Sequence, residues 1–162
     1  MKLFKLTLAA SLVAFAGTAI AAQDGLLDTE SVGTADVLIV KQNAVQLTDL
    51  DDLDFGAPQL VAADLTVSDG VCVFSTTTGY SVEATSANAF SMVSGADAMA
   101  YDIAWNGVNI ESTAVTGVGD PASLTCGGAT NAVILVTVAA ADFNGANPGN
   151  YSDTVTLTVS PN

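Results

Sequence analysis

The sequence contains no histidine and no arginine, and only three lysines stand against 17 acidic residues among 162. Two of these lysines, Lys2 and Lys5, lie at the extreme N-terminus, so Lys41 is the single cation in the rest of the chain. Nucleic acids and anionic membrane surfaces are bound through Lys and Arg, and the composition argues against both partners. Catalysis that depends on histidine is excluded outright.

Long apolar runs are lacking beyond the N-terminus. There, Lys2 and Lys5 precede an apolar stretch over Leu6 to Ala16, and Ala19-Ile-Ala21 supplies small residues for cleavage. We expect residues 1–21 to be a signal peptide that is removed after Ala21, with an uncleaved membrane anchor as the alternative. The protein is therefore predicted to be exported.

Cysteine is scarce, with Cys72 and Cys126 as the only two. Export places them in an oxidising compartment, where a disulfide is the default. Such a bond would close a loop of roughly 55 residues and contribute about 4 kcal/mol in the chain-entropy model. A reactive thiol or a metal ligand is the alternative, but no histidine or third cysteine is available to support it.

Charged residues make up only 12% of the chain, whereas half of the residues are apolar. Disorder and charge-covered helices are both disfavoured, and small β-forming residues are typical of an extracellular β-sandwich. Alternating segments separated by turns predict one all-β domain, an antiparallel sandwich of immunoglobulin-like type. The expected strands lie near residues 35–40, 43–48, 63–68, 71–75, 80–85, 99–105, 108–112, 131–139 and 151–160.

Several boundaries of these elements are explicit expectations. Asp69-Gly70 is expected to form a turn, and residues 86–97, 116–122 and 140–150 are expected to be loops. The nearly continuous apolar run over residues 131–139 predicts a strand that is buried on both faces. Tyr80, Tyr101 and Trp105 share the parity of apolar neighbours, which places them in the core.

The last strand ends almost at the C-terminus, and an exposed strand edge must be covered, paired or blunted. A second alternating apolar segment follows the leader, with Ala35, Val37 and Ile39 on one face. If a neighbouring copy supplied this segment, it could pair with the exposed edge of the last strand. These two features predict a subunit of a polymer.

The chain resembles the spore coat protein U family, which includes the pilins of archaic chaperone–usher pili. The resemblance spans nearly the whole chain after the leader, and its motifs are of low to moderate specificity. They are Leu53-Asp-Phe-Gly56, Cys72 at a strand end, Tyr80-Ser-Val82, Met99-Ala-Tyr101-Asp-Ile103 and the terminal Gly149-x-Tyr151-x-Asp153-Thr-Val-Thr-Leu-Thr-Val159.

This resemblance implies an immunoglobulin-like sandwich that lacks its final strand. A periplasmic chaperone would fill the gap first, an outer-membrane usher would assemble the subunits, and the extension of the next subunit would then replace the chaperone. Residues 22–41 would be the donor extension, with Ala35, Val37 and Ile39 inserted, and residues 42–162 the pilin-like domain. The acceptor edge would comprise Tyr151, Val155, Leu157 and Val159.

The sequence departs from the family pattern in three places. The first strand of the domain carries no cysteine, so the partner of Cys72 would be Cys126. Lys41 falls where another apolar donor residue would be expected, and the chain finishes Ser160-Pro161-Asn162 rather than on an aromatic strand end. A structural fibre or coat subunit is the leading hypothesis, with roles in cell adhesion and biofilm, exported through the periplasm to the cell surface. An adhesive tip or ligand-binding module is the alternative.

No cofactor, metal or catalytic residue is assigned. The acidic cluster Asp49, Asp51, Asp52 and Asp54 could attract Ca²⁺, but its spacing does not match an EF-hand loop. Paired carboxylates for glycoside hydrolysis are abundant but unfocused. Phe90 and Phe143, in expected loops, are the candidates for exposed contact with a ligand.

Overall fold

The structure is a computed structural model in which residues 23–162 are described, and it divides into a unit ending at Lys41 and a unit spanning Gln42–Asn162. The predicted signal peptide, residues 1–21, lies outside the described residues. We call residues 23–41 the extension and residues 42–162 the sandwich domain. None of the helices found among residues 23–162 has the length and apolar content needed to cross a bilayer.

Within residues 42–162, ten strands pair exclusively in antiparallel fashion. Two short helices, η1 (Cys126–Gly128) and α1 (Ala140–Gly145), interrupt them. The strands are β1 (Val45–Thr48), β2 (Leu65–Ser75), β3 (Gly79–Ser86), β4 (Ser91–Ser94), β5 (Asp97–Ala100), β6 (Asp102–Trp105), β7 (Val108–Asn109), β8 (Val115–Val118), β9 (Ala132–Val138) and β10 (Val155–Pro161).

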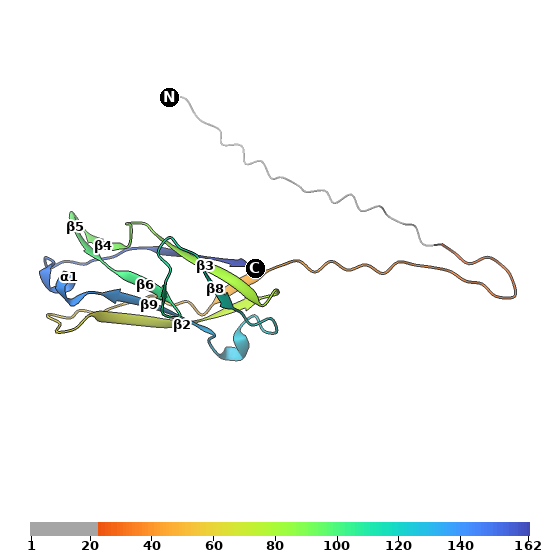
Figure 1. The fold of residues 1–162 in the computed structure, drawn as a ribbon, viewed down its shortest axis with the longest axis horizontal. Coiled ribbons are helices and arrows are strands. Elements are labelled where there is room, and N and C mark those ends of the chain that lie inside the picture. The colour runs from red at the N-terminus through yellow and green to blue at the C-terminus, as the bar shows by residue number, and fades with distance from the viewer. Residues whose placement is uncertain (1–22) are drawn as a thin grey trace, which may run out of the picture. The chain divides into compact units, whose positions relative to one another are not determined.

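The strands form two main layers (Figure 1). One sheet has the order β1-β2-β9-β6-β7 and the other has the order β10-β3-β8, while β4 and β5 form a separate hairpin. Strand β10, drawn in dark blue, ends at the C-terminus and lies at one edge of the three-stranded sheet. The predicted all-β, antiparallel, sandwich-like fold is confirmed.

The core lies between the two layers and is centred on aromatic side chains. Trp105 and Tyr80 are almost completely buried, and the Trp105 Nε1–H group donates a hydrogen bond of 2.9 Å to the Tyr80 hydroxyl. Their rings meet edge to face at 6.2 Å, a favourable arrangement for aromatic pairs. Tyr101 is also buried, so the predicted packing of all three aromatics in the core is confirmed.

The predicted turn at Asp69-Gly70 is wrong, because β2 runs without a break from Leu65 to Ser75. Asp69 and Gly70 pair in register with β9. A Cβ atom at Gly70 would lie 3.1 Å from the Thr130 side chain, so the glycine permits a close approach in the sheet. The neighbouring strand therefore overrides the local turn signal.

Three expected loops contain regular structure instead. Residues 86–97 include β4, residues 116–122 include the end of β8, and residues 140–150 include α1. The expected strand 99–105 is also divided between β5 and β6. These segments are short and poorly alternating, and their structure depends on partners distant in sequence.

Strand β9 was expected to be buried on both faces, but only one of its faces is buried. Ala132, Ile134, Val136 and Val138 are buried, but Val133 on the opposite face is 44% exposed. An apolar run therefore does not by itself prove that both faces are covered.

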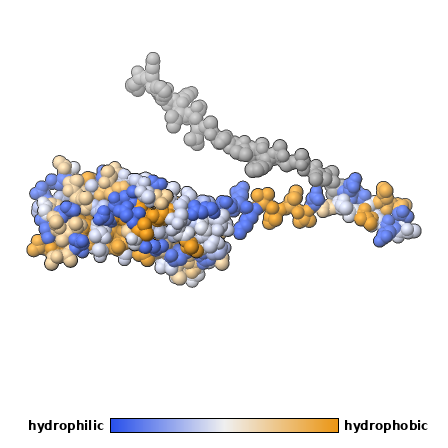
Figure 2. Space-filling model, in the orientation of Figure 1, coloured by the Kyte–Doolittle hydropathy of each residue, from blue (hydrophilic) through white to orange (hydrophobic). Residues whose placement is uncertain are grey.

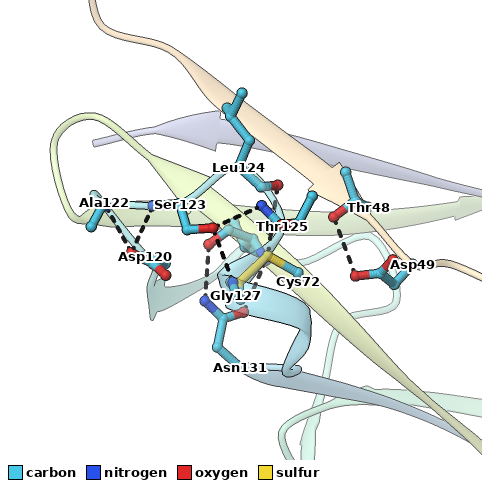
Figure 3. The surroundings of a disulfide bond; sticks show 12 residues. Thr48, Asp49, Cys72, Asp120, Ala122, Ser123, Leu124, Thr125, Gly127 and Asn131 are labelled. Carbon is cyan, nitrogen blue, oxygen red and sulfur yellow. Dashed lines mark hydrogen bonds between the residues drawn. A yellow bond between two sulfur atoms is a disulfide. The ribbon is translucent and has the colours of Figure 1, made fainter.

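The predicted disulfide between Cys72 and Cys126 is confirmed, with 5.8 Å between the two Cα atoms (Figure 3). Cys72 is fully buried in β2, and Cys126 begins η1. The surrounding loop is ordered by Ser123 and by Asn131, whose side chain exchanges two 2.9 Å hydrogen bonds with the backbone of Val73. The bond joins the η1 loop to the five-stranded sheet.

The extension does not form the strand expected at residues 35–40. One isolated bridge joins Gln23 to Thr34, and the remaining residues up to Lys41 have no strand pairing. A lone extended segment has no neighbour to complete its backbone hydrogen bonds, so alternation alone cannot make it a strand.

Candidate functional site

Three of the four predicted acceptor residues, Val155, Leu157 and Val159, lie on β10, which has one unpaired edge, whereas Tyr151 precedes the strand. This strand pairs with β3 from Val155 to Pro161, and no strand among the described residues pairs with its other edge. The alternating side chains Val155, Leu157 and Val159 are half-buried and pack against the core. A long, partly apolar edge with free backbone groups is a template for another strand.

A groove opens beside the first half of β10. Its cavity of about 480 Å³ is lined by Val155 and Leu157 of β10 and by Leu53 and Phe55 of the segment after β1. Ile134, together with other core residues, lines the same cavity. The groove thus gives an incoming apolar side chain direct access to the core between the sheets.

The groove is open on the side opposite β10 because β1 ends early, at Thr48. Asp49 has a φ of 61°, a left-handed conformation that turns the chain out of the ladder after Thr48. Beyond this point the chain continues without strand pairing, and the Asp51 amide donates a 2.8 Å hydrogen bond to the Asp69 carboxylate. Strand β1 therefore pairs only with the last four residues of β2.

A second hollow of about 600 Å³ continues from the same region toward α1. It shares Leu53, Phe55 and Tyr151 with the groove and adds Phe143 and Leu60. The Tyr151 hydroxyl donates a 2.9 Å hydrogen bond to the Asn147 carbonyl, which positions this ring between the two hollows. Together they form a trough that extends beyond the start of β10.

Asp153 lies at the entrance of β10 and lines the groove. Its Oδ2 accepts hydrogen bonds from the Tyr101 hydroxyl at 2.6 Å and from the Ser86 hydroxyl. Its Oδ1 accepts from Asn88 Nδ2 and from the Thr154 amide, both at 2.8 Å. The carboxylate therefore joins two other parts of the domain, the end of β3 with the loop after it and Tyr101 between β5 and β6, to the start of β10.

These contacts determine the charge of Asp153. Burial acts to raise the pKa of its carboxyl group, but the hydrogen bonds from Ser86 and Tyr101, followed by those from Thr154 and Asn88, lower the pKa below its ordinary value. Burial and the adjacent carboxylate raise the pKa of Tyr101, which keeps its hydroxyl as a donor. Asp153 is therefore an anion at neutral pH.

The segment after β1, which lines the groove opposite β10, is also acidic. Asp51 and Asp52 line the cavity and are exposed, and Asp54 follows along the second hollow. The sequence of the sandwich domain contains no lysine, arginine or histidine to neutralise them. Among residues 23–162, no group of three or more acidic, histidine or cysteine side chains is placed to hold a metal ion.

The predicted donor residues belong to a strongly exposed apolar segment. Val37 and Ile39 are 95% and 94% exposed, and the alternate residues Leu38 and Val40 are also exposed. Figure 2 shows apolar residues gathered along the extension. Soluble proteins seldom leave such a run of apolar residues uncovered.

Phe90 and Phe143, the candidates for exposed ligand contact, instead pack against the core while half-buried. The Phe90 ring meets Tyr101 edge to face at 6.1 Å. The roles of Ser86 and Asn88 at Asp153 were not anticipated, because polar residues in an expected loop carry no signal for a partner 65 or more residues away. No exposed aromatic platform arises from these two phenylalanines.

Comparison with known proteins adds no family assignment. No protein-family model matches the chain, and no curated protein matches it significantly. The resemblance to the spore coat protein U family therefore stays a prediction.

Proposed function

We propose that this protein is a structural subunit that polymerises by strand exchange, in which the extension of one copy completes the sandwich domain of another. The observation that carries the proposal is the free edge of β10 beside a groove that reaches the core. The proposal includes the finer prediction of an immunoglobulin-like fold that lacks its last strand. It assigns no catalytic step to the protein.

The extension has the chemistry that the groove requires. Burying an aliphatic side chain such as Val37 or Ile39 contributes about 1.5–3 kcal/mol, and Ala35 contributes less. Each backbone hydrogen bond to the β10 edge adds roughly 0.5–1.5 kcal/mol. Because the same contacts cover core residues, filling the groove would stabilise the fold and hold the subunits together.

Export and assembly partners follow from the same proposal. An exposed apolar segment and an open groove in one chain would associate prematurely, so a carrier occupying the groove would be needed before assembly. The periplasmic chaperone and outer-membrane usher implied by the resemblance would serve this purpose. The assembled product would be a fibre or coat on the cell surface.

Deletion of residues 22–41 from the mature chain tests the proposal. We expect the full mature chain to form linear polymers in electron microscopy and the deleted chain to form none. Adding a synthetic peptide of residues 32–41 to the deleted chain should stabilise it against heat without producing polymers. Polymerisation that is unchanged by the deletion would remove the donor assignment.

The adhesive-tip alternative requires apolar loop tips that are open to a ligand. Phe90 and Phe143, the residues proposed for that role, are packed against the core. A tip subunit would also have no use for an apolar extension. The structural subunit is therefore the function we retain.

A further inference from the structure

The inward faces of β10 and of the extension have complementary patterns. On β10, the alternating set begins with the anion Asp153 and continues with Val155, Leu157 and Val159. On the extension, the alternating set begins with apolar residues and ends with the cation Lys41. Each segment therefore has three apolar positions and one charge, at opposite ends and of opposite sign.

Only an antiparallel arrangement of the extension and β10 aligns the three apolar positions and the charge of one segment with those of the other. Directly opposed residues in an antiparallel pair lie on the same face, so the apolar sets can meet while the two charges face each other. The opposed pairs are then Lys41 with Asp153, Ile39 with Val155, Val37 with Leu157 and Ala35 with Val159. In a parallel arrangement of the same apolar residues, Lys41 would lie opposite Pro161 and Gly33 opposite Asp153.

Charge favours the antiparallel arrangement. Asp51 and Asp52 line the same groove as Asp153, so Lys41 would enter a groove that carries three carboxylates. The sandwich domain offers no cation of its own there. The hydrogen bonds to Asp153 come from neutral groups, which stabilise its charge without cancelling it.

A chain cannot place its own Lys41 at this position. Gln42 and Ala44 hydrogen-bond to Thr76, in the turn between β2 and β3, and the end of β10 reaches the same turn through Asn162 and Gly79. From Pro161 back to Asp153 a strand spans about 26 Å. One to three extended residues reach at most about 11 Å, so the antiparallel register needs a second copy.

We infer that Lys41 of one copy lies opposite Asp153 of the next when the extension enters the groove, and that this charge pair sets the register of the inserted strand. This inference rests on the proposed strand exchange. It also explains why the extension ends on a cation where a further apolar residue would be expected. Self-insertion, which is restricted to the parallel arrangement, would leave Lys41 away from the carboxylates.

Paired cysteines in the mature chain test the direction. In the inferred register, the outward-facing residues Val40 and Thr154 are opposed, whereas Thr34 and Thr154 are opposed only in the parallel arrangement. Opposed Cα atoms in antiparallel strands lie about 4.5–5.5 Å apart, within the range of a disulfide. Each pair is introduced as Val40→Cys with Thr154→Cys, or Thr34→Cys with Thr154→Cys, and oxidised mildly before non-reducing electrophoresis.

We expect a ladder of covalent oligomers from the first pair and none from the second. A ladder from the second pair alone, or polymers without cross-links from either, would overturn the register and leave strand exchange standing. Cross-linked monomers without a ladder would overturn both proposals. A wild-type chain that never polymerises would refute the proposed function, and the inference with it.

Substitution of Lys41 tests the charge pair separately. At low salt, Lys41→Glu should slow polymerisation about tenfold relative to the wild type, because a like charge would enter an acidic site. Lys41→Met, which keeps the length and apolar stem, should slow it less. The three rates should converge in high salt, where the charges are screened. Equal rates at low salt would refute the role of the pair.

Discussion

The Asp153 carboxylate illustrates how one polar residue can organise the entrance of a strand. It interrupts the apolar side of β10, yet it accepts four hydrogen bonds from three parts of the domain. Its lowered pKa means that the folded state favours the charged form. The stabilisation is complete above the unfolded-state pKa, near 3.8, and is lost as the pH falls through the lower folded-state pKa.

At this residue scale, Asp153→Asn should lower the free energy of unfolding by about 2 kcal/mol at neutral pH, because hydrogen bonds to a charged group are lost. It should also reduce the loss of stability that the wild type shows below about pH 4. Urea unfolding followed by the fluorescence of the buried Trp105 measures both effects. Asp102→Asn, at an exposed position on β6, is the matched control. Identical acid profiles for Asp153→Asn and the wild type would contradict this assignment.

At the scale of a single element, β10 combines an apolar side with a threonine side. Leu157 lines the groove, whereas Thr156 is exposed on the opposite side. Leu157→Asp should abolish polymerisation by placing a carboxylate where apolar side chains are to be inserted, and Thr156→Asp should leave it nearly intact. Electron microscopy compares the two variants, which carry the same added charge.

A mixing experiment separates a blocked groove from a failure to fold. A folded Leu157→Asp chain keeps a working extension, so small amounts added to wild-type chains should shorten the polymers by ending their growth. Circular dichroism confirms that the variant is folded. Wild-type polymer lengths that do not change in the presence of the folded variant would show that Leu157 does not belong to the acceptor edge.

At the scale of the whole molecule, the disulfide connects segments that are 54 residues apart. Replacing Cys72 and Cys126 together by alanine should cost about 4 kcal/mol, a large fraction of the stability of a small domain. The denaturant midpoint should fall accordingly, and reduced wild-type protein should show a similar fall. Midpoints unaffected by the substitution would mean that the bond contributes little to stability.

The sequence was sufficient for the features that depend on local pattern and composition. Alternation located β3 and β10, and the scarcity of charge indicated an all-β domain. Two cysteines in a chain predicted to be exported indicated the disulfide, and the parity of Tyr80 and Trp105 indicated core positions. Each of these signals is strong because burial selects residue types at a fixed period.

Tertiary structure decided the features that depend on contacts between distant residues. Pairing with β9 carries β2 straight through Asp69-Gly70, and the turn of the chain at Asp49 leaves the groove open beside β10. The sequence by itself determined that the chain has an apolar extension ending in Lys41 and a last strand with one apolar side. Only the fold brought Asp153, Leu53 and Ile134 to one groove, because a strand edge becomes free or paired only when the sheets assemble.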